Sequence, residues 1–94
     1  MQTIKEAPGL FYTGDSPDKL LSYLEYRMNG AILTILYVEV DIHLRGHGIG
    51  RELVAYAVDY ARRNALKVNA VCSYARSQLG QHPEYRDVLD LPAR

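Results

Sequence analysis

The sequence has no tryptophan and one cysteine among its 94 residues. A single cysteine, Cys72, excludes an intramolecular disulfide framework and fits a reducing compartment, so we expect a cytoplasmic protein. The longest apolar run, residues 31–38, falls far short of the roughly 20 residues that a membrane-spanning helix needs. The first residues also lack a signal-peptide pattern. These absences predict a protein with no membrane partner.

Neither sign of charge is in excess. Eleven lysines and arginines balance eleven aspartates and glutamates, and the isoelectric point is near 6.8. Because a dedicated nucleic-acid binder has a basic footprint, we expect no nucleic-acid partner. The hydrophobic share of 48% and the charged share of 23% are ordinary for a globular protein. The length suits one core but not a second unit, so residues 1–94 are expected to form a single domain.

Short apolar runs bounded by turn residues predict the first part of a sheet. Residues 9–14 predict a strand that stops before the turn-forming sequence DSPD at 15–18. Two further strands, 19–28 and 31–40, flank Asn29-Gly30, the pair that best tolerates a type I′ turn. Since 31–40 is apolar at nearly every position, we expect both of its faces to be covered.

The second half of the chain predicts a crossover. From Ile49 onward, apolar residues fall on one half of a helical wheel and charged residues on the other, which indicates an amphipathic helix of about four turns. Residues 66–72 predict a strand, and 73–81 a short helix that ends near Gly80. Strand, helix and strand form a βαβ unit with parallel strands. The fold class is therefore α/β: a mixed sheet with an antiparallel hairpin, a βαβ crossover and helices on the sheet faces.

Three glycines, at positions 46, 48 and 50, lie between the apolar strand and the amphipathic helix. Ligands of a βαβ unit bind beyond the carboxyl ends of its strands, where this loop lies. A helix N-terminus offers unpaired N–H groups and a partial positive charge, and glycine lets a phosphate approach them closely. Arg45 adds a positive charge beside them. The loop therefore predicts a phosphate-binding site.

Two common phosphate-binding motifs do not fit this loop. A P-loop needs lysine and then serine or threonine after its last glycine, but Arg51 and Glu52 follow Gly50. The spacing G-x-G-x-x-G of dinucleotide-binding proteins is also missing. The pattern Arg-x-x-Gly-x-Gly at 45–50 instead resembles the loop with which GNAT superfamily N-acetyltransferases hold the pyrophosphate of acetyl-coenzyme A. The strand before the loop and the helix and strand after it occur in the order that this resemblance demands.

The resemblance is closer to small stand-alone GNAT-like proteins and covers about residues 9–88, through EVDIHLRGHGIG, VNAVCSYA and HPEY. It implies a minimal GNAT-like fold with acetyl-coenzyme A as cosubstrate. Tyr37 is a departure, because many relatives of this type carry histidine there. The resemblance and the loop together predict these coenzyme-binding residues: Val40, Arg45, Gly46, His47, Gly48, Ile49 and Gly50.

Acetyl transfer needs a neutral amine, yet a lysine-like pKa near 10.4 leaves only about one amine in a thousand deprotonated at pH 7. Glu39 is the candidate general base, because it is the sole carboxylate of the strand 31–40 and burial raises the pKa of a carboxylate. The alternative is a surface glutamate at a sheet edge. The backbone N–H of Val40 is the oxyanion donor that the resemblance implies, where adjacent strands splay apart.

Two side chains after the last strand complete the candidate catalytic set. The resemblance implies that Cys72 lies near the sulfur of the coenzyme, where it lines the site or acts as a nucleophile; the alternative is a small buried hydrophobe. Tyr74 is the candidate acid for the leaving thiolate, or simply a packed tyrosine. The remaining polar candidates have no zinc-ligand spacing, so we expect no metal site: Asp41, His43, His47 and His82.

The sequence thus predicts an acetyl-coenzyme-A-dependent N-acetyltransferase. Its acceptor is an amine on a protein side chain or on a small molecule such as a polyamine, because so short a chain has little room for a deep acceptor pocket. A monomer and a homodimer are both compatible with the sequence. The alternative is a coenzyme-A-binding or interaction module of the same fold without turnover, which Tyr37 in place of histidine favours.

Overall fold

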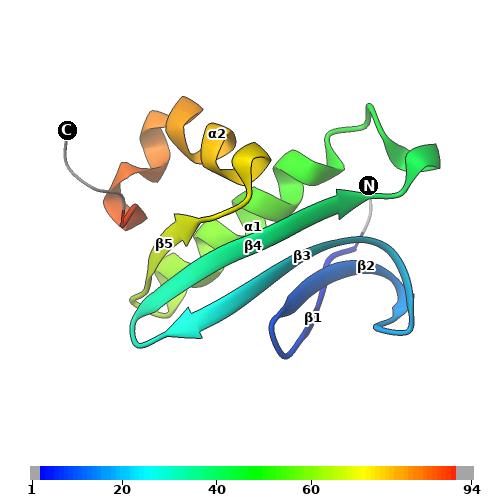
Figure 1. The fold of residues 1–94 in the computed structure, drawn as a ribbon, viewed down its shortest axis with the longest axis horizontal. Coiled ribbons are helices and arrows are strands. Elements are labelled where there is room, and N and C mark those ends of the chain that lie inside the picture. Colours follow the sequence, from blue (N-terminus) through cyan, green and yellow to red (C-terminus); the bar gives the residue numbers. More distant parts are fainter. Residues whose placement is uncertain (1–2, 91–94) are drawn as a thin grey trace.

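The computed structural model describes residues 3–90, which form a five-stranded sheet with helices packed against it (Figure 1). The order along the sheet follows the chain, with β1 to β4 antiparallel and β5 parallel to β4. The mixed sheet and the parallel crossover are therefore confirmed. The strands are β1 Lys5–Ala7, β2 Leu10–Ser16, β3 Lys19–Asn29, β4 Ile32–Val40 and β5 Lys67–Ala70.

Over the same described residues, two α-helices and two 3₁₀ segments accompany the sheet. They are η1 Ile42–Leu44, α1 Ile49–Arg63, α2 Ser73–Gln81 and η2 Pro83–Val88. Both α-helices match the predicted ranges, and α1 buries the apolar stripe that predicted it. Within residues 3–90, no helix combines the length and the apolarity that crossing a bilayer requires.

Two local predictions are wrong. Strand β2 runs through Asp15 and Ser16, so only Pro17 and Asp18 remain in the first turn. In the second turn, Asn29 still pairs with Ile32, and the two-residue loop is therefore Gly30 and Ala31. Gly30 has φ +61° while neither neighbour has a positive φ. A type I′ turn needs two positive φ angles, so this turn needs glycine only at its first position.

A bulge in β4 exchanges the faces of that strand. Tyr26 pairs with Ile35, but Glu25 pairs with Tyr37, which leaves Leu36 as an extra residue. An extra residue sends the side chains that follow it to the opposite faces. Tyr37 is accordingly 48% exposed, although Ile35 two residues earlier is fully buried. The expectation that both faces of this strand are covered is therefore wrong.

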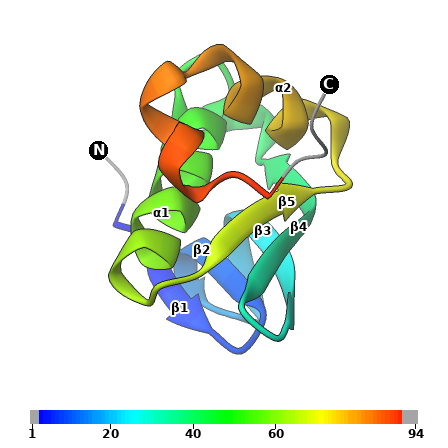
Figure 2. The same ribbon diagram turned by 90° about the vertical axis from the view of Figure 1, so that its left-hand side faces the viewer.

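The core lies between the inner face of the sheet and α1, with α2 beside α1 (Figure 2). Phe11 is fully buried at its centre and stacks on Tyr26 at 4.7 Å between ring centroids. Tyr56 and Tyr60 of α1 approach the same ring at 4.9 and 5.1 Å. These contacts join β2, β3 and α1, so the helix that carries the glycine loop has a fixed position on the sheet.

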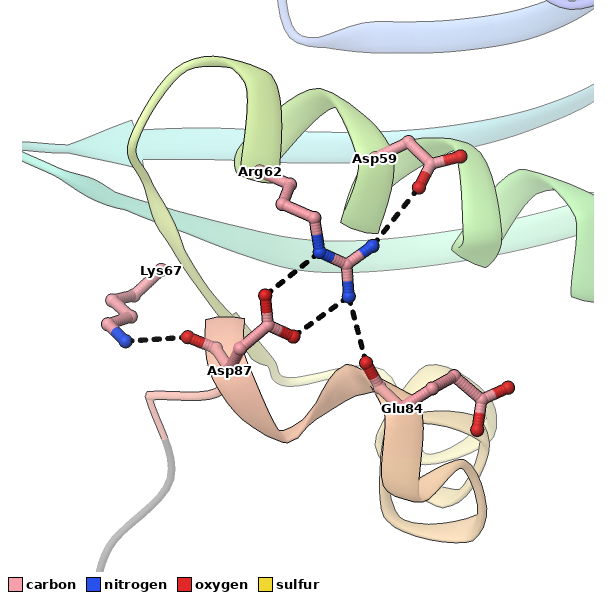
Figure 3. A network of polar contacts seen from close by, with 5 residues as sticks. All are labelled: Asp59, Arg62, Lys67, Glu84 and Asp87. Atoms are coloured by element: carbon pink, nitrogen blue, oxygen red, sulfur yellow. Dashed lines mark hydrogen bonds and ion pairs between the residues drawn. The ribbon is translucent and has the colours of Figure 1, made fainter.

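The C-terminal end of α1 is tied to η2 by charged groups (Figure 3). Nε and Nη2 of Arg62 donate to the two carboxylate oxygens of Asp87 at 2.9 and 2.8 Å. Nη2 also donates to the backbone oxygen of Glu84 at 2.8 Å, and Nζ of Lys67 to that of Asp87 at 2.8 Å. The hydrogen bonds from Arg62 hold the pKa of Asp87 below its usual value. One strand-like contact continues this attachment, because Leu89 bridges to Val68 of β5 in parallel register.

We predict that Asp87→Asn destabilises the protein in a pH-dependent way. Because the folded pKa of Asp87 is lowered, its contribution is present above the unfolded value near 3.9 and is lost as the pH falls through the folded value. Urea unfolding is therefore expected to show a less stable variant at pH 7 and stabilities that converge once the pH is below the folded pKa of Asp87. Asp59→Asn is the control, since Asp59 meets Arg62 through one 3.3 Å contact and its loss should be smaller. A difference between Asp87→Asn and wild type that does not change with pH contradicts this origin.

Candidate functional site

A cleft of about 370 Å³ lies between the end of β4, the glycine loop and the start of α2. It is lined by residues of these three segments: Val38, Glu39, Val40, Leu44, Arg45, Gly46, Gly48, Ile49, Gly50 and Tyr74. The fold therefore brings together all the predicted site residues except His47 and Cys72. His47 is an exposed residue of the loop, and Cys72 is half-buried at the N-cap of α2.

The cleft exists because β5 leaves β4 early. Strand β5 pairs with β4 only over Ile32–Ile35, and Figure 1 shows it beside the first part of the longer strand. The amides of Val71 and Cys72 still donate to the carbonyl of Ile35, at 2.9 and 3.4 Å, and the chain then turns into α2. In the described residues, the later part of β4 thus has no strand on that side.

Backbone amides of β4 point into this opening. The amide of Asp41 donates to the carbonyl of Leu21 on β3 at 2.9 Å. Along an antiparallel strand, the amides of successive residues point alternately toward the partner strand and away from it, so the amides of Val38 and Val40 point away from β3. They point toward the side of β4 on which β5 pairs only as far as Ile35. The sequence analysis selected Val40 but missed Val38. The bulge at Leu36 determines which amides of β4 point away from β3, and the sequence gives no sign of that bulge.

The first turn of α1 presents unpaired amides to the same cleft. The earliest helical hydrogen bond runs from the amide of Glu52 to the carbonyl of Gly48, at 3.0 Å. The amides of Ile49, Gly50 and Arg51 precede it and have no acceptor within the helix. Gly48 is the N-cap and has no side chain to satisfy them. Such a turn fits an anion, because free N–H groups and the helix dipole act together there.

The three glycines are needed for two different reasons. Gly46 and Gly48 have φ angles of +86° and +78°, in the left-handed region that other residues rarely adopt. Gly50 is helical, and a Cβ there would lie 2.9 Å from the hydroxyl oxygen of Tyr74 and 3.2 Å from its ring. The sequence prediction assigned every glycine to ligand approach. At Gly50, the fit between α1 and α2 is a sufficient reason.

Arg45 and Glu39 form an ion pair at the mouth of the cleft. Nη2 of Arg45 lies 3.2 Å from Oε2 of Glu39, and Nε donates to the carbonyl of Val40 at 3.1 Å. The other oxygen of Glu39 accepts a 3.2 Å hydrogen bond from Tyr37, and this bond raises the pKa of the Tyr37 hydroxyl. The Glu39 side chain is 40% exposed. Glu39 is therefore only partly buried, because the bulge puts it on the uncovered face of the sheet.

Tyr74 extends from the first turn of α2 over Gly50. Partial burial raises the pKa of its hydroxyl, although nearby Arg51 acts in the opposite direction. A hydroxyl that keeps its proton at neutral pH suits a proton donor. The role of Tyr74 as the acid for the leaving thiolate stays a prediction, and Cys72 is the N-cap residue of the same helix.

A comparison with protein families identifies the family of this chain. A family model described as GCN5-related N-acetyl-transferase matches residues 11–88. The chain belongs to this family.

Solved structures agree with the assignment to the GCN5-related family. A GCN5-like protein from Staphylococcus aureus is 33% identical, with a TM-score of 0.82 over 99% of this chain and 91% of that one. The ribosomal-protein-S18-alanine N-acetyltransferase from Escherichia coli is 14% identical, with a TM-score of 0.61. The NatC complex bound to Gag peptide and CoA contains a chain that is 21% identical, with a TM-score of 0.59.

The last two likenesses cover 77% of this chain but only 49% and 54% of those proteins, so the chain spans about half their length. They show the fold that this family member shares with larger acetyltransferases. No curated protein matches the chain significantly.

We predict that alanine at position 50 gains no stability unless Tyr74 is also removed. Glycine inside a helix costs about 0.5–1 kcal/mol relative to alanine, so Gly80→Ala, whose Cβ meets no atom within 4 Å, should stabilise the protein by up to that amount. Gly50→Ala should show no such gain, because its Cβ meets Tyr74. In a Tyr74→Ala background the gain should appear. Chemical denaturation of the four variants measures this, and an equal gain from both alanines in the wild-type background argues against the contact.

Proposed function

We propose that the protein transfers the acetyl group of acetyl-coenzyme A to a primary amine. The observation that carries the proposal is the run of unpaired amides at the start of α1, which opens onto a cleft along the free part of β4. The family to which the chain belongs supports the same reaction. Acetyl-coenzyme A supplies the thioester, and the residues of this chain bind it and move protons.

The glycine loop is the proposed donor site. The amides of residues 46–50 donate to the diphosphate, and the positive φ angles at Gly46 and Gly48 aim the backbone at it without a side chain in between. Arg45 lines the same cleft and contributes a positive charge. The amides of Val38 and Val40 offer two further donors along the free edge of β4 for the part of the donor that reaches the thioester.

The proposed chemistry uses three groups around the end of β4. The Val40 amide stabilises the negative charge that develops on the carbonyl oxygen during attack by the amine. Glu39 accepts a proton from the acceptor, and Tyr74, whose pKa is raised, returns a proton to the thiolate that leaves. Cys72 is not among the residues that line the cleft, so we favour direct attack over an acyl-cysteine intermediate.

The acceptor is proposed to be a side chain of a protein or a polyamine. Glu39 lies on the uncovered face of the sheet, beside the exposed Tyr37, and this face is open to a large partner. The NatC structure holds a Gag peptide together with CoA, which supports a peptide acceptor for a domain of this fold. A chain this short leaves little room for a deep small-molecule pocket.

We predict that coenzyme A stabilises the wild-type protein and that Gly46→Ala weakens this binding. Ligand at 100 times its Kd should add about 2.7 kcal/mol to the free energy of unfolding, which a thermal melt detects. A methyl group at Gly46 lies where the diphosphate approaches, and losing one charge-assisted hydrogen bond lowers affinity by about tenfold or more.

Gly30→Ala is the matched control for Gly46→Ala. Both glycines have a positive φ, and a Cβ at either meets no atom within 4 Å. Each alanine should therefore cost about 1–2 kcal/mol of stability, but only the one at position 46 should change the Kd. Equal affinities in the two variants would refute the assignment of the loop.

We predict that Glu39→Gln and Tyr74→Phe each lower kcat by about 10²-fold or more, the usual contribution of a general base or acid. Release of free thiol from acetyl-coenzyme A in the presence of lysine-rich peptides or polyamines measures turnover. Glu25→Gln, on the neighbouring strand opposite Tyr37, is the control and should keep wild-type activity. Binding of coenzyme A without turnover on any amine would instead support the non-catalytic module, which Tyr37 favours.

A further inference from the structure

Arg45 lies between the proposed donor site and the uncovered face of the sheet. It lines the cleft, yet two of its guanidinium nitrogens are directed at the end of β4, one at Oε2 of Glu39 and one at the carbonyl of Val40. Glu39 is in turn fixed through its other oxygen by the hydroxyl of Tyr37. The positive charge expected to meet a diphosphate is thus already paired with a carboxylate.

Glu39 and a bound diphosphate would compete for the charge of Arg45, so each weakens the interaction of the other with it. Glu39 neutralises much of the charge that Arg45 could offer to the cleft, and it adds negative charge near the place where the diphosphate would bind. Both side chains of the ion pair are partly exposed, so the pair contributes little to stability. A diphosphate can therefore compete with Glu39 for Arg45. A diphosphate also combines this contact with the free amides of α1, which a lone carboxylate on β4 cannot reach.

We infer that Arg45 is shared between Glu39 and the diphosphate of the donor, so that donor binding releases Glu39 to receive the acceptor. This inference rests on the proposed function. Arg45 acts here as a positioning residue: it holds Glu39 in the free protein and moves to the donor in the complex. When Arg45 moves to the donor, Glu39 becomes a free carboxylate, and this happens only after the thioester donor has bound.

The surroundings of Glu39 fit a cationic acceptor once Arg45 has left. Tyr23 is the cross-strand partner of Glu39, and its ring centroid lies 6.1 Å from that of Tyr37. Aromatic faces beside a carboxylate attract an ammonium group. While Arg45 is paired there, its charge repels the same group. The donor should therefore bind before the amine, and by thermodynamic linkage the amine should in turn tighten donor binding.

The test is a double-mutant cycle on the Kd of coenzyme A, measured by calorimetry without any acceptor. Glu39→Gln should tighten binding about two- to fivefold, which corresponds to the strength of an exposed ion pair. Arg45→Gln should weaken it about tenfold. In the Arg45→Gln background, Glu39→Gln should have no effect, because the residue through which Glu39 acts is gone.

Glu25→Gln removes one negative charge from the same face of the sheet. It therefore controls for the effect of net charge on the binding of coenzyme A. It should leave the Kd within error of wild type. The inference is overturned if Glu39→Gln leaves the Kd unchanged or raises it, or if it tightens binding equally with and without Arg45. A wild-type protein that does not bind coenzyme A at all refutes the proposed function itself, whereas the other outcomes refute only the sharing of Arg45.

Discussion

The early separation of β5 from β4 is the constraint on which the site depends. Parallel pairing stops at Ile35, and the strand continues to Val40 without a neighbour on that side among the described residues. Backbone donors that a sheet would normally consume stay available there. The crossover from β4 to β5 then places the first turn of α1 beside this same edge, with its own amides unpaired. Two sources of unsatisfied N–H groups therefore meet in one cleft.

The bulge at Leu36 divides the end of β4 between two environments. Val38 and Val40 turn toward the cleft and the core, while Tyr37 and Glu39 turn toward the uncovered face. Without the extra residue, these pairs would exchange places and a carboxylate would be buried without a partner, which is costly. One irregularity in the ladder thus decides which side chains at the end of β4 face the core and which lie on the uncovered face of the sheet.

Periodicity and the glycine loop predicted the parts of the fold that local sequence determines. Helix α1 has a strong apolar stripe, and the order of strand, loop, helix and strand permits few topologies, so the crossover and the cleft followed. The bulge, the exposure of Glu39 and its pairing with Arg45 depend on register across strands, which a single sequence does not specify. Strand β1, only the residues KEA, is too short and polar to be distinguished from a loop. The role of Gly50 required knowing where Tyr74 lies.

The contact between the C-terminal end of α1 and η2 affects how far the edge of the sheet is open to other chains. An uncovered sheet edge is a template for pairing with other chains and thus for aggregation. Here Arg62 anchors η2 so that Leu89 and Asp90 lie along β5, and the amide of Asp90 donates to the carbonyl of Val68 at 2.8 Å. The opposite edge is β1, a strand of only three residues. The β5 edge is thereby partly covered and the β1 edge is short, so these two margins offer few free backbone groups to another chain.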